Sequence, residues 1–194
     1  LGYFFPNLYT YIFHPFKMIS GFPFIQPTIV SNTLKKFNIV TSEFYHAGMV
    51  TGLLFSAPFL ILGLAPFFSK NKISKEKDSF DSPRSYKFIL VLLGGSFLLN
   101  FLLILFYFYG QTRFLVDSIS QITLLAILGY WQIVSRKLRV NSLQSKLFLI
   151  LENFLLIFTI CTSLLLAFSS ETSRFETLNP QFFEKINEFL TIQK

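Results

Sequence analysis

Charged residues are scarce in this chain of 194 residues, where they make up only 14% of the total. A soluble domain carries about 25%. The chain is instead 52% hydrophobic, with a mean hydropathy of +0.54. So little charge excludes an ordinary water-soluble surface, and we expect an integral membrane protein whose main partner is the lipid bilayer.

Cysteine and metal-ligand patterns are also lacking. Cys161 is the only cysteine, so no internal disulfide can form, and neither a CxxC pair nor a Cys/His zinc spacing occurs. Because Cys161 lies inside an apolar run, we expect a small buried hydrophobic residue rather than a reactive thiol. The sequence predicts no metal and no cofactor.

Sequence patterns that carry catalysis are missing as well. There is no Gly-rich phosphate loop, no G-x-S-x-G elbow and no pair of carboxylates within an apolar run. The net charge of +7 could suggest nucleic-acid binding. However, the basic residues gather in two short segments between apolar runs, which is a topology signal, and no recognisable binding motif accompanies them. We predict no nucleic-acid partner, and the sequence assigns no catalytic residue.

Long apolar runs, in contrast, are abundant. A membrane-spanning helix needs about 20 such residues, and we predict four spans, at Tyr45–Phe68, Phe88–Tyr109, Phe114–Val134 and Leu147–Phe168. The predicted fold class is therefore an all-α polytopic membrane protein, with residues 44–170 as its four-helix transmembrane region. In the first span, Gly48, Gly52 and Ser56 recur every four residues. Such a small-residue ridge allows another helix to approach closely.

The two ends of the chain differ from this region. Residues 1–43 are aromatic but broken by four prolines and two glycines, so we expect a loop at the outer membrane interface. In residues 171–194, Asn179 and Pro180 form a typical helix start, and apolar residues follow at helical spacing. This amphipathic tail should lie on the outer membrane surface or against another outward-facing segment.

The basic residues predict an orientation. Lys and Arg number 3, 6, 1, 4 and 3 in residues 1–43, 69–87, 113, 135–146 and 169–194. Since cytoplasmic loops are enriched in Lys and Arg, loops 69–87 and 135–146 should face the cytoplasm. Both termini and the joint that contains Arg113 should then lie outside the cell membrane.

The polar joint between the second and third spans carries Arg113 and Asp117, four residues apart where a helix begins. This spacing places both side chains on one helix face at the membrane boundary. One interpretation is an ion pair that pins the helix end and contributes little when solvated. The other is a substrate-binding site, in which Arg113 is presented to an anionic group such as a lipid-linked phosphate and Asp117 orients it.

Other polar residues near or within the spans have more ordinary interpretations. Glu43 and His46 are three residues apart, but a Glu-x-x-His pair binds metal in a bundle only with matching ligands from other helices. No second such pair occurs, so we expect a polar anchor at the membrane interface. Glu152, inside the fourth span, is either a proton-relay carboxylate or a residue that snorkels or pairs with Lys146 or an upstream Asn.

The run Arg113-Phe-Leu-Val-Asp117, followed by the uncharged Ser118–Ser135, resembles the late helices of GT-C-type membrane glycosyltransferases, such as the protein mannosyltransferase-like group. Gly52–Phe59 is similar to a segment of their uncharacterised bacterial relatives. The resemblance implies a polyprenyl-phosphate-linked sugar donor whose phosphate Arg113 contacts. It also implies that the catalytic acid and further transmembrane helices lie upstream of Leu1.

We therefore expect the C-terminal membrane part of a glycosyltransferase-like protein in the cell (inner or plasma) membrane. The chain starts with Leu1 rather than Met, which is typical of a piece of a longer protein. Two alternatives stay open. One is a non-enzymatic membrane protein that packs against partner helices through the ridge from Gly48 to Ser56, and the other is a transporter fragment in which Glu152 carries a proton or an ion.

Overall fold

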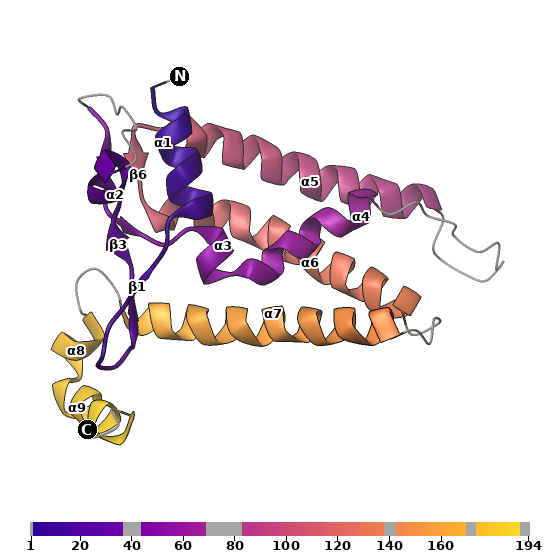
Figure 1. Ribbon diagram of the computed structural model, residues 1–194. Coiled ribbons are helices and arrows are strands. Elements are labelled where there is room, and N and C mark those ends of the chain that lie inside the picture. The colour runs from indigo at the N-terminus through magenta and orange to yellow at the C-terminus, as the bar shows by residue number, and fades with distance from the viewer. Residues whose placement is uncertain (1, 37–43, 69–82, 138–142, 170–173, 191–194) are drawn as a thin grey trace.

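Three long helices lie side by side in the computed structural model, which describes residues 2–36, 44–68, 83–137, 143–169 and 174–190 (Figure 1). They are α5 (Pro83–Leu105), α6 (Val116–Lys137) and α7 (Leu143–Phe168). An irregular segment lies among them, and short strands and helices gather at one end. We call this the joint end, because the joint between α5 and α6 (residues 106–115) lies there, and we call the opposite end the loop end.

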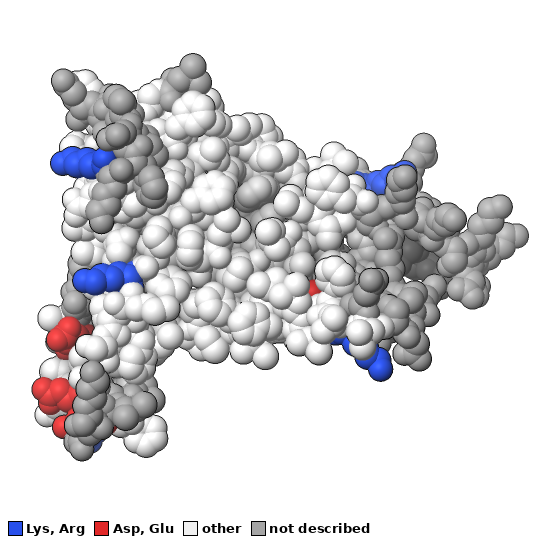
Figure 2. All heavy atoms as spheres, viewed as in Figure 1, with Lys and Arg blue, Asp and Glu red and all other residues white. Residues whose placement is uncertain are grey.

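Each long helix contains a segment long and apolar enough to cross a membrane. These segments are Tyr86–Leu105, Val116–Ser135 and Lys146–Phe168, with mean hydropathies of 2.6, 1.3 and 2.2. Figure 2 shows Lys, Arg, Asp and Glu gathered at the two ends of the visible face, with a nearly uncharged band between them. The arrangement is compatible with an integral membrane protein.

The predicted first span, Tyr45–Phe68, is not one continuous helix, so the described residues contain three membrane-length helices and the fourth is not confirmed. The segment contains two short strands and then α3 (Leu53–Ser56), the 3₁₀-helix η2 (Pro58–Leu64) and α4 (Ala65–Phe68). Proline disfavours helical geometry in the residue before it, and Ala57, before Pro58, has φ −146° and ψ 63°. The helix therefore breaks between α3 and η2.

Hydroxyl groups of α7 satisfy the backbone groups that this break releases. Thr162 Oγ1 donates to the carbonyl oxygen of Ser56 at 2.7 Å, and the backbone N–H of Phe59 donates to Thr159 Oγ1 at 3.0 Å. Interrupted helices are tolerated at membrane depth when neighbouring Ser and Thr side chains supply such partners. We call α3, η2 and α4 together the broken segment. It is held among the long helices by specific hydrogen bonds.

Two glycines allow the broken segment to approach its neighbours closely. A Cβ atom at Gly129 would overlap the carbonyl oxygen of Leu62, so only glycine fits where α6 meets η2. A Cβ atom at Gly52 would lie 2.6 Å from the backbone of Ile12. Gly52 has extended geometry and precedes α3, so the predicted ridge of small residues is not one face of a helix. Its middle member packs against the N-terminal segment instead.

Residues 2–36 and 44–50 pack against the joint as one folded structure, which we call the cap, rather than as the loop that the sequence predicted. Its helical elements are α1 (Phe4–Leu8), the π-helical turn η1 (Tyr9–Phe13) and α2 (Val30–Lys36). Its strand pairs are antiparallel β1 (Lys17–Met18) and β2 (Ile25–Gln26), antiparallel β3 (Thr28–Ile29) and β5 (Met49–Val50), and parallel β4 (His46–Ala47) and β6 (Tyr109–Gly110). The fold is therefore mostly helical but not purely so. Tyr11, Val30 and Val50 of the cap pack with Leu105 and Leu115 in one core cluster.

Asn7 ties the cap to the end of α5. Its side-chain Nδ2 lies 3.2 Å, 3.1 Å and 2.6 Å from the carbonyl oxygens of Ile104, Leu105 and Tyr107. The last carbonyl groups of a helix lack hydrogen-bond partners within the helix. The side chain of Asn7, which is fully buried, donates hydrogen bonds to these carbonyl oxygens. The helix ends at Leu105, four residues before the predicted Tyr109, where the chain turns toward strand β6.

The C-terminal helices pack against the cap at the joint end. They are α8 (Arg174–Leu178) and α9 (Pro180–Leu190), the latter beginning where the sequence places a helix start. The backbone N–H of Phe22 donates to Asn187 Oδ1 at 3.0 Å, and the rings of Phe22 and Phe183 lie 5.7 Å apart. The tail is therefore not isolated from the rest of the protein, because it contacts a segment at the same end.

Cys161 is exposed on α7, so the prediction of a buried side chain was wrong. Only 11% of the membrane-length segment of α7 is buried within the protein. An apolar sequence position does not imply burial by protein when a bilayer can cover the same side chain.

Replacing Asn7 should destabilise the protein. Asn7→Ala leaves buried carbonyl groups at the end of α5 without their donor, which costs about 1–3 kcal/mol. Thermal unfolding of the intact protein in nanodiscs should show a lower Tm, while Asn32→Ala, at an exposed position of α2, should not change it. Equal Tm values for the two variants would contradict a capping role for Asn7.

Candidate functional site

The joint between α5 and α6 contains several short elements of structure. Tyr107 and Phe108 follow α5, strand β6 pairs with β4, and the 3₁₀-helix η3 (Thr112–Leu115) leads into α6. Arg113 belongs to η3, but its side chain lies outside what the structure describes. Asp117 is exposed in the first turn of α6. Whether Arg113 and Asp117 form one site therefore stays a prediction.

Tyrosine side chains hold the joint against the cap. The fully buried Tyr11 donates its hydroxyl hydrogen to the carbonyl oxygen of Tyr109 at 3.4 Å and accepts from the backbone N–H of Gln111 at 3.2 Å. Burial raises the pKa of Tyr11 to about 12, although the hydrogen bond from Gln111 opposes the rise. Tyr45 donates to Asn7 Oδ1 at 3.0 Å. The tyrosine hydroxyl groups therefore stay protonated at neutral pH, and their hydrogen bonds position the joint.

His14 is a fully buried imidazole that connects two segments of the cap. Thr28 Oγ1 donates to the carbonyl oxygen of Pro15 at 3.0 Å, so it accepts from His14 Nε2 at 2.8 Å. The hydrogen is thereby assigned to Nε2, and the buried Nδ1 has no hydrogen-bond partner within the described part of the chain. Burial lowers the pKa of His14 from its ordinary value of 6.5. The hydrogen bond to the Thr28 backbone raises the pKa by a smaller amount. The ring is therefore neutral at pH 7.

An apolar cavity of about 440 Å³ lies among the broken segment, α6 and α7. Ile119, Thr123, Ile127 and Tyr130 form its wall on α6. Their spacing follows one helix face for roughly 16 Å, at 1.5 Å per residue. Ile127 is 49% exposed, so the cavity opens on the surface of the membrane-length part of α6.

The hydroxyl groups around the cavity are largely engaged with the protein. Thr159 accepts from Phe59, Ser163 lies 3.4 Å from the carbonyl oxygen of Ser56, and the Ser56 side chain donates to Gly52. Tyr130 donates to Asn153 Oδ1 at 3.0 Å. What the cavity offers a ligand is therefore mostly hydrocarbon surface. Its volume lies within the range of about 300–1,000 Å³ for small-molecule pockets.

Glu152 is buried in α7, where only 3% of its surface is exposed. An ionisable residue at this depth is a candidate functional group by default. Its neighbour Asn153 bonds to Tyr130, one of the residues that line the cavity. Glu152 therefore faces the protein interior, and the simple snorkelling that the sequence allowed does not describe it.

The described residues contain no group of three or more His, Cys, Asp or Glu side chains that could hold a metal ion. His46 is exposed in β4, with its ring 6.5 Å from that of Tyr109. Glu43 lies outside the described residues, so its pairing with His46 stays a prediction.

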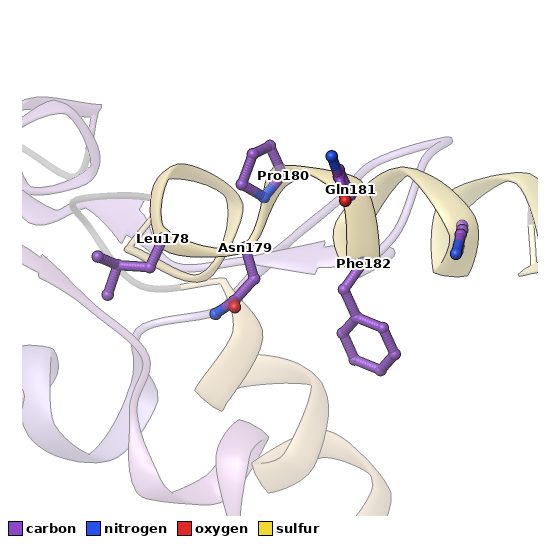
Figure 3. Close-up of a pocket in the computed structure, with 6 residues that line it drawn as sticks. Leu178, Asn179, Pro180, Gln181 and Phe182 are labelled. Carbon is purple, nitrogen blue, oxygen red and sulfur yellow. The ribbon is translucent and has the colours of Figure 1, made fainter.

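A second hollow, of about 430 Å³, lies where α8 meets α9. Figure 3 shows Asn179 and Phe182 pointing to one side of the turn and Pro180 and Gln181 to the other. Lys185 also lines it. Because these side chains come from one short stretch and diverge, the hollow has no set of convergent groups that could define a ligand.

No sequence pattern indicated that Asn7 and Tyr11 contact the joint or that His14 connects two segments of the cap. Each contact joins residues that are far apart in the chain, and single polar residues in an aromatic segment have no periodicity. The sequence contains a partial indication of the cavity. Pro58 favours a break in the helix, and a broken helix packs less evenly against its neighbours.

Protonation of His14 should destabilise the fold in acid. Because its pKa is lower in the folded state, the unfolded chain binds the proton more readily. Stability should therefore fall as the pH drops below about 6.5, by at most ~1.4 kcal/mol per pH unit, until the folded-state pKa is passed. Urea unfolding at pH 7.5 and 5.5 measures the loss. His14→Gln should reduce it and His46→Gln should not, so an equal loss in all three proteins would contradict the assignment.

Comparisons with protein-family models, with curated proteins and with solved structures find no match to this chain. The resemblance to GT-C-type glycosyltransferases at Gly52–Phe59 and Arg113–Ser135 therefore stays a prediction from these residues.

Proposed function

We propose that this chain is the late membrane region of a GT-C-type glycosyltransferase that uses a polyprenyl-phosphate-linked sugar donor. The observation that carries the proposal is the position of the apolar cavity. It begins at Ile119, two residues after Asp117, and extends along α6 away from the joint. An apolar chain in the cavity would leave its phosphate end at the joint.

The chemistry of the cavity supports a long hydrocarbon ligand. Its surface is mostly apolar and it opens beside Ile127. A polyprenyl chain can therefore enter from the bilayer without exposing polar groups. In this proposal Arg113 binds the phosphate through its planar guanidinium group, and Asp117, in the first turn of α6, orients Arg113.

The proposed location is the cell membrane, with loops 69–87 and 135–146 in the cytoplasm and both termini outside. In Figure 1 the end of α4, the start of α5, the end of α6 and the start of α7 all lie at the loop end. The cap, α8 and α9 lie at the joint end. The basic residues concentrate in the sequence between these helix ends, in 69–87 and 135–146, so the positive-inside rule supports this orientation.

The burial of Glu152 favours one other candidate, a transporter in which this carboxylate carries a proton or an ion. An inverted repeat of hydropathy in the full reading frame would support that function instead. The non-enzymatic alternative loses its proposed contact surface, because Gly52 packs inside the protein against Ile12.

Cysteine labelling tests the orientation. In a Cys161→Ala background, a membrane-impermeant maleimide applied to intact cells should label Gln181→Cys on α9. It should label Ser135→Cys, at the end of α6, only after permeabilisation. Both positions are exposed, so protein burial does not limit the reagent. The reverse labelling pattern would overturn the proposed topology.

Two substitutions test the two ends of the proposed ligand separately. Thr123→Phe places a ring in the cavity and should weaken binding of both polyprenyl phosphate and polyprenol, by about tenfold or ~1.4 kcal/mol. Arg113→Lys loses bidentate contact with a phosphate, so it should weaken polyprenyl phosphate alone. Native mass spectrometry of the intact protein measures retention of each lipid.

The matched control is Leu124→Phe, which adds a ring on the exposed side of the same helix, where Leu124 is 51% exposed. It should bind both lipids as the wild type does. If Thr123→Phe and Leu124→Phe bind polyprenol equally, the cavity is not the site of the chain. If Arg113→Lys binds polyprenyl phosphate normally, Arg113 only anchors the helix.

A further inference from the structure

A small pocket of about 130 Å³ lies where the β1–β2 hairpin, the end of α7 and the helices α8 and α9 meet. Phe168 closes the membrane-length segment of α7, and Ser169, the next residue, lines the pocket. A bilayer that covers this segment would change from hydrocarbon to headgroups at the level of the pocket. It is separate from the apolar cavity, with which it shares no lining residue.

Aromatic rings from three parts of the chain build one side of the pocket. Phe22, at the tip of the hairpin, lies 5.4 Å from the ring of Phe168 and 5.7 Å from that of Phe183. The hydrogen bond from its N–H to Asn187 fixes the tip against α9. Aromatic faces attract organic cations through the negative charge of their π systems.

The polar lining consists mainly of hydrogen-bond acceptors. Glu176 supplies a carboxylate and is the only ionisable group among the described residues that line the pocket. The hydroxyl hydrogen of Ser169 is already donated to the carbonyl oxygen of Leu166, so its oxygen is left to accept. Gln26 also lines the pocket, and the oxygen of its side-chain amide is a hydrogen-bond acceptor. A carboxylate with two neutral acceptors and aromatic walls suits a cation with three N–H groups and a short carbon stem.

We propose that this pocket binds a primary alkylammonium group, such as the ethanolamine of a phospholipid headgroup. The three N–H groups of the ammonium match Glu176, Ser169 and Gln26, and the rings cover its methylene carbons. A quaternary ammonium cannot donate these hydrogen bonds, and an anionic headgroup meets the carboxylate unfavourably. The pocket therefore distinguishes ethanolamine from choline and from glycerol phosphate headgroups.

The surroundings of the pocket favour a lipid as the source of the amine. Leu178, Phe182 and Phe189 of α8 and α9 are 75%, 57% and 88% exposed. Exposed apolar side chains beside the end of a membrane-length helix are suited to the headgroup boundary. A phospholipid held there would place its headgroup beside the pocket, whereas a free amine would arrive from water.

One cation of the protein itself could compete for Glu176. Lys17 is exposed and pairs with Gln26 across the hairpin, so both side chains lie on the same face of the hairpin. If the Lys17 ammonium group pairs with the Glu176 carboxylate, it occupies the position that we propose for the external amine. The experiment therefore includes Lys17→Met, which removes this competitor.

Native mass spectrometry of the intact protein, titrated with lipids that carry identical acyl chains, tests the inference. Phosphatidylethanolamine should be retained several-fold more than phosphatidylcholine or phosphatidylglycerol. Glu176→Gln should reduce this preference to the level of phosphatidylcholine, while the matched control Glu184→Gln, at an exposed position of α9, should keep it. Lys17→Met should keep or increase it.

Free ethanolamine separates the two sources of the amine. Displacement of the lipid by millimolar ethanolamine, but not by choline, would show that the amine alone is recognised, and retention of the lipid would assign the site to the intact headgroup. Equal retention of the ethanolamine and choline lipids would overturn the inference. So would an unchanged preference in Glu176→Gln, or its loss in Lys17→Met. None of these outcomes depends on glycosyl transfer, because the polyprenyl lipids are measured separately.

Discussion

Backbone polar groups that leave a helix inside an apolar bundle must be hydrogen-bonded by the protein, and much of this structure follows from that constraint. An unsatisfied group in hydrocarbon costs several kcal/mol. Pro58 releases the carbonyl of Ser56 and the N–H of Phe59, and Thr162 and Thr159 of α7 bond to them. At the other interruption, Asn7 bonds to the final carbonyl groups of α5. The hydroxyls of α7 and the buried amide of the cap are therefore structural requirements, although each could be mistaken for part of a polar binding site.

The same constraint shapes the cavity. A continuous helix in place of α3, η2 and α4 could pack against α6 and α7 along its whole length. The break instead brings η2 against α6 at Gly129 and directs α3 toward α7, which leaves space between the two contacts. Because Thr159 and Ser163 contribute hydrogen bonds to the broken segment, little polar capacity remains for a ligand. An apolar chain is consequently a better match for this space than a sugar.

Sequence reasoning predicted the features that depend on local pattern. The uncharged runs predicted α5, α6 and α7, and Asn179 with Pro180 predicted the start of α9. It did not predict that Tyr45–Phe68 is divided into α3, η2 and α4, because the hydropathy of the segment indicated one spanning helix. It could not find the cap, since two-residue strands have no measurable periodicity and the bonds of Asn7 join positions about 100 residues apart. Of the candidate site, it located Asp117 at the start of α6 but not the cavity, because a cavity depends on how three segments pack.

The cap connects the two ligand sites that we propose. Through Asn7 and Tyr11 it fixes the joint at the head of α6, and through Phe22 it contacts the end of α7. At the opposite end of the cavity, Tyr130 and Asn153 join the same two long helices. The separation of α6 and α7, and with it the width of the cavity, is therefore set at both ends by hydrogen bonds and ring contacts. A lipid headgroup that binds beside Phe22 contacts one of these two fixed points, so its binding energy would also stabilise the arrangement that keeps the cavity open.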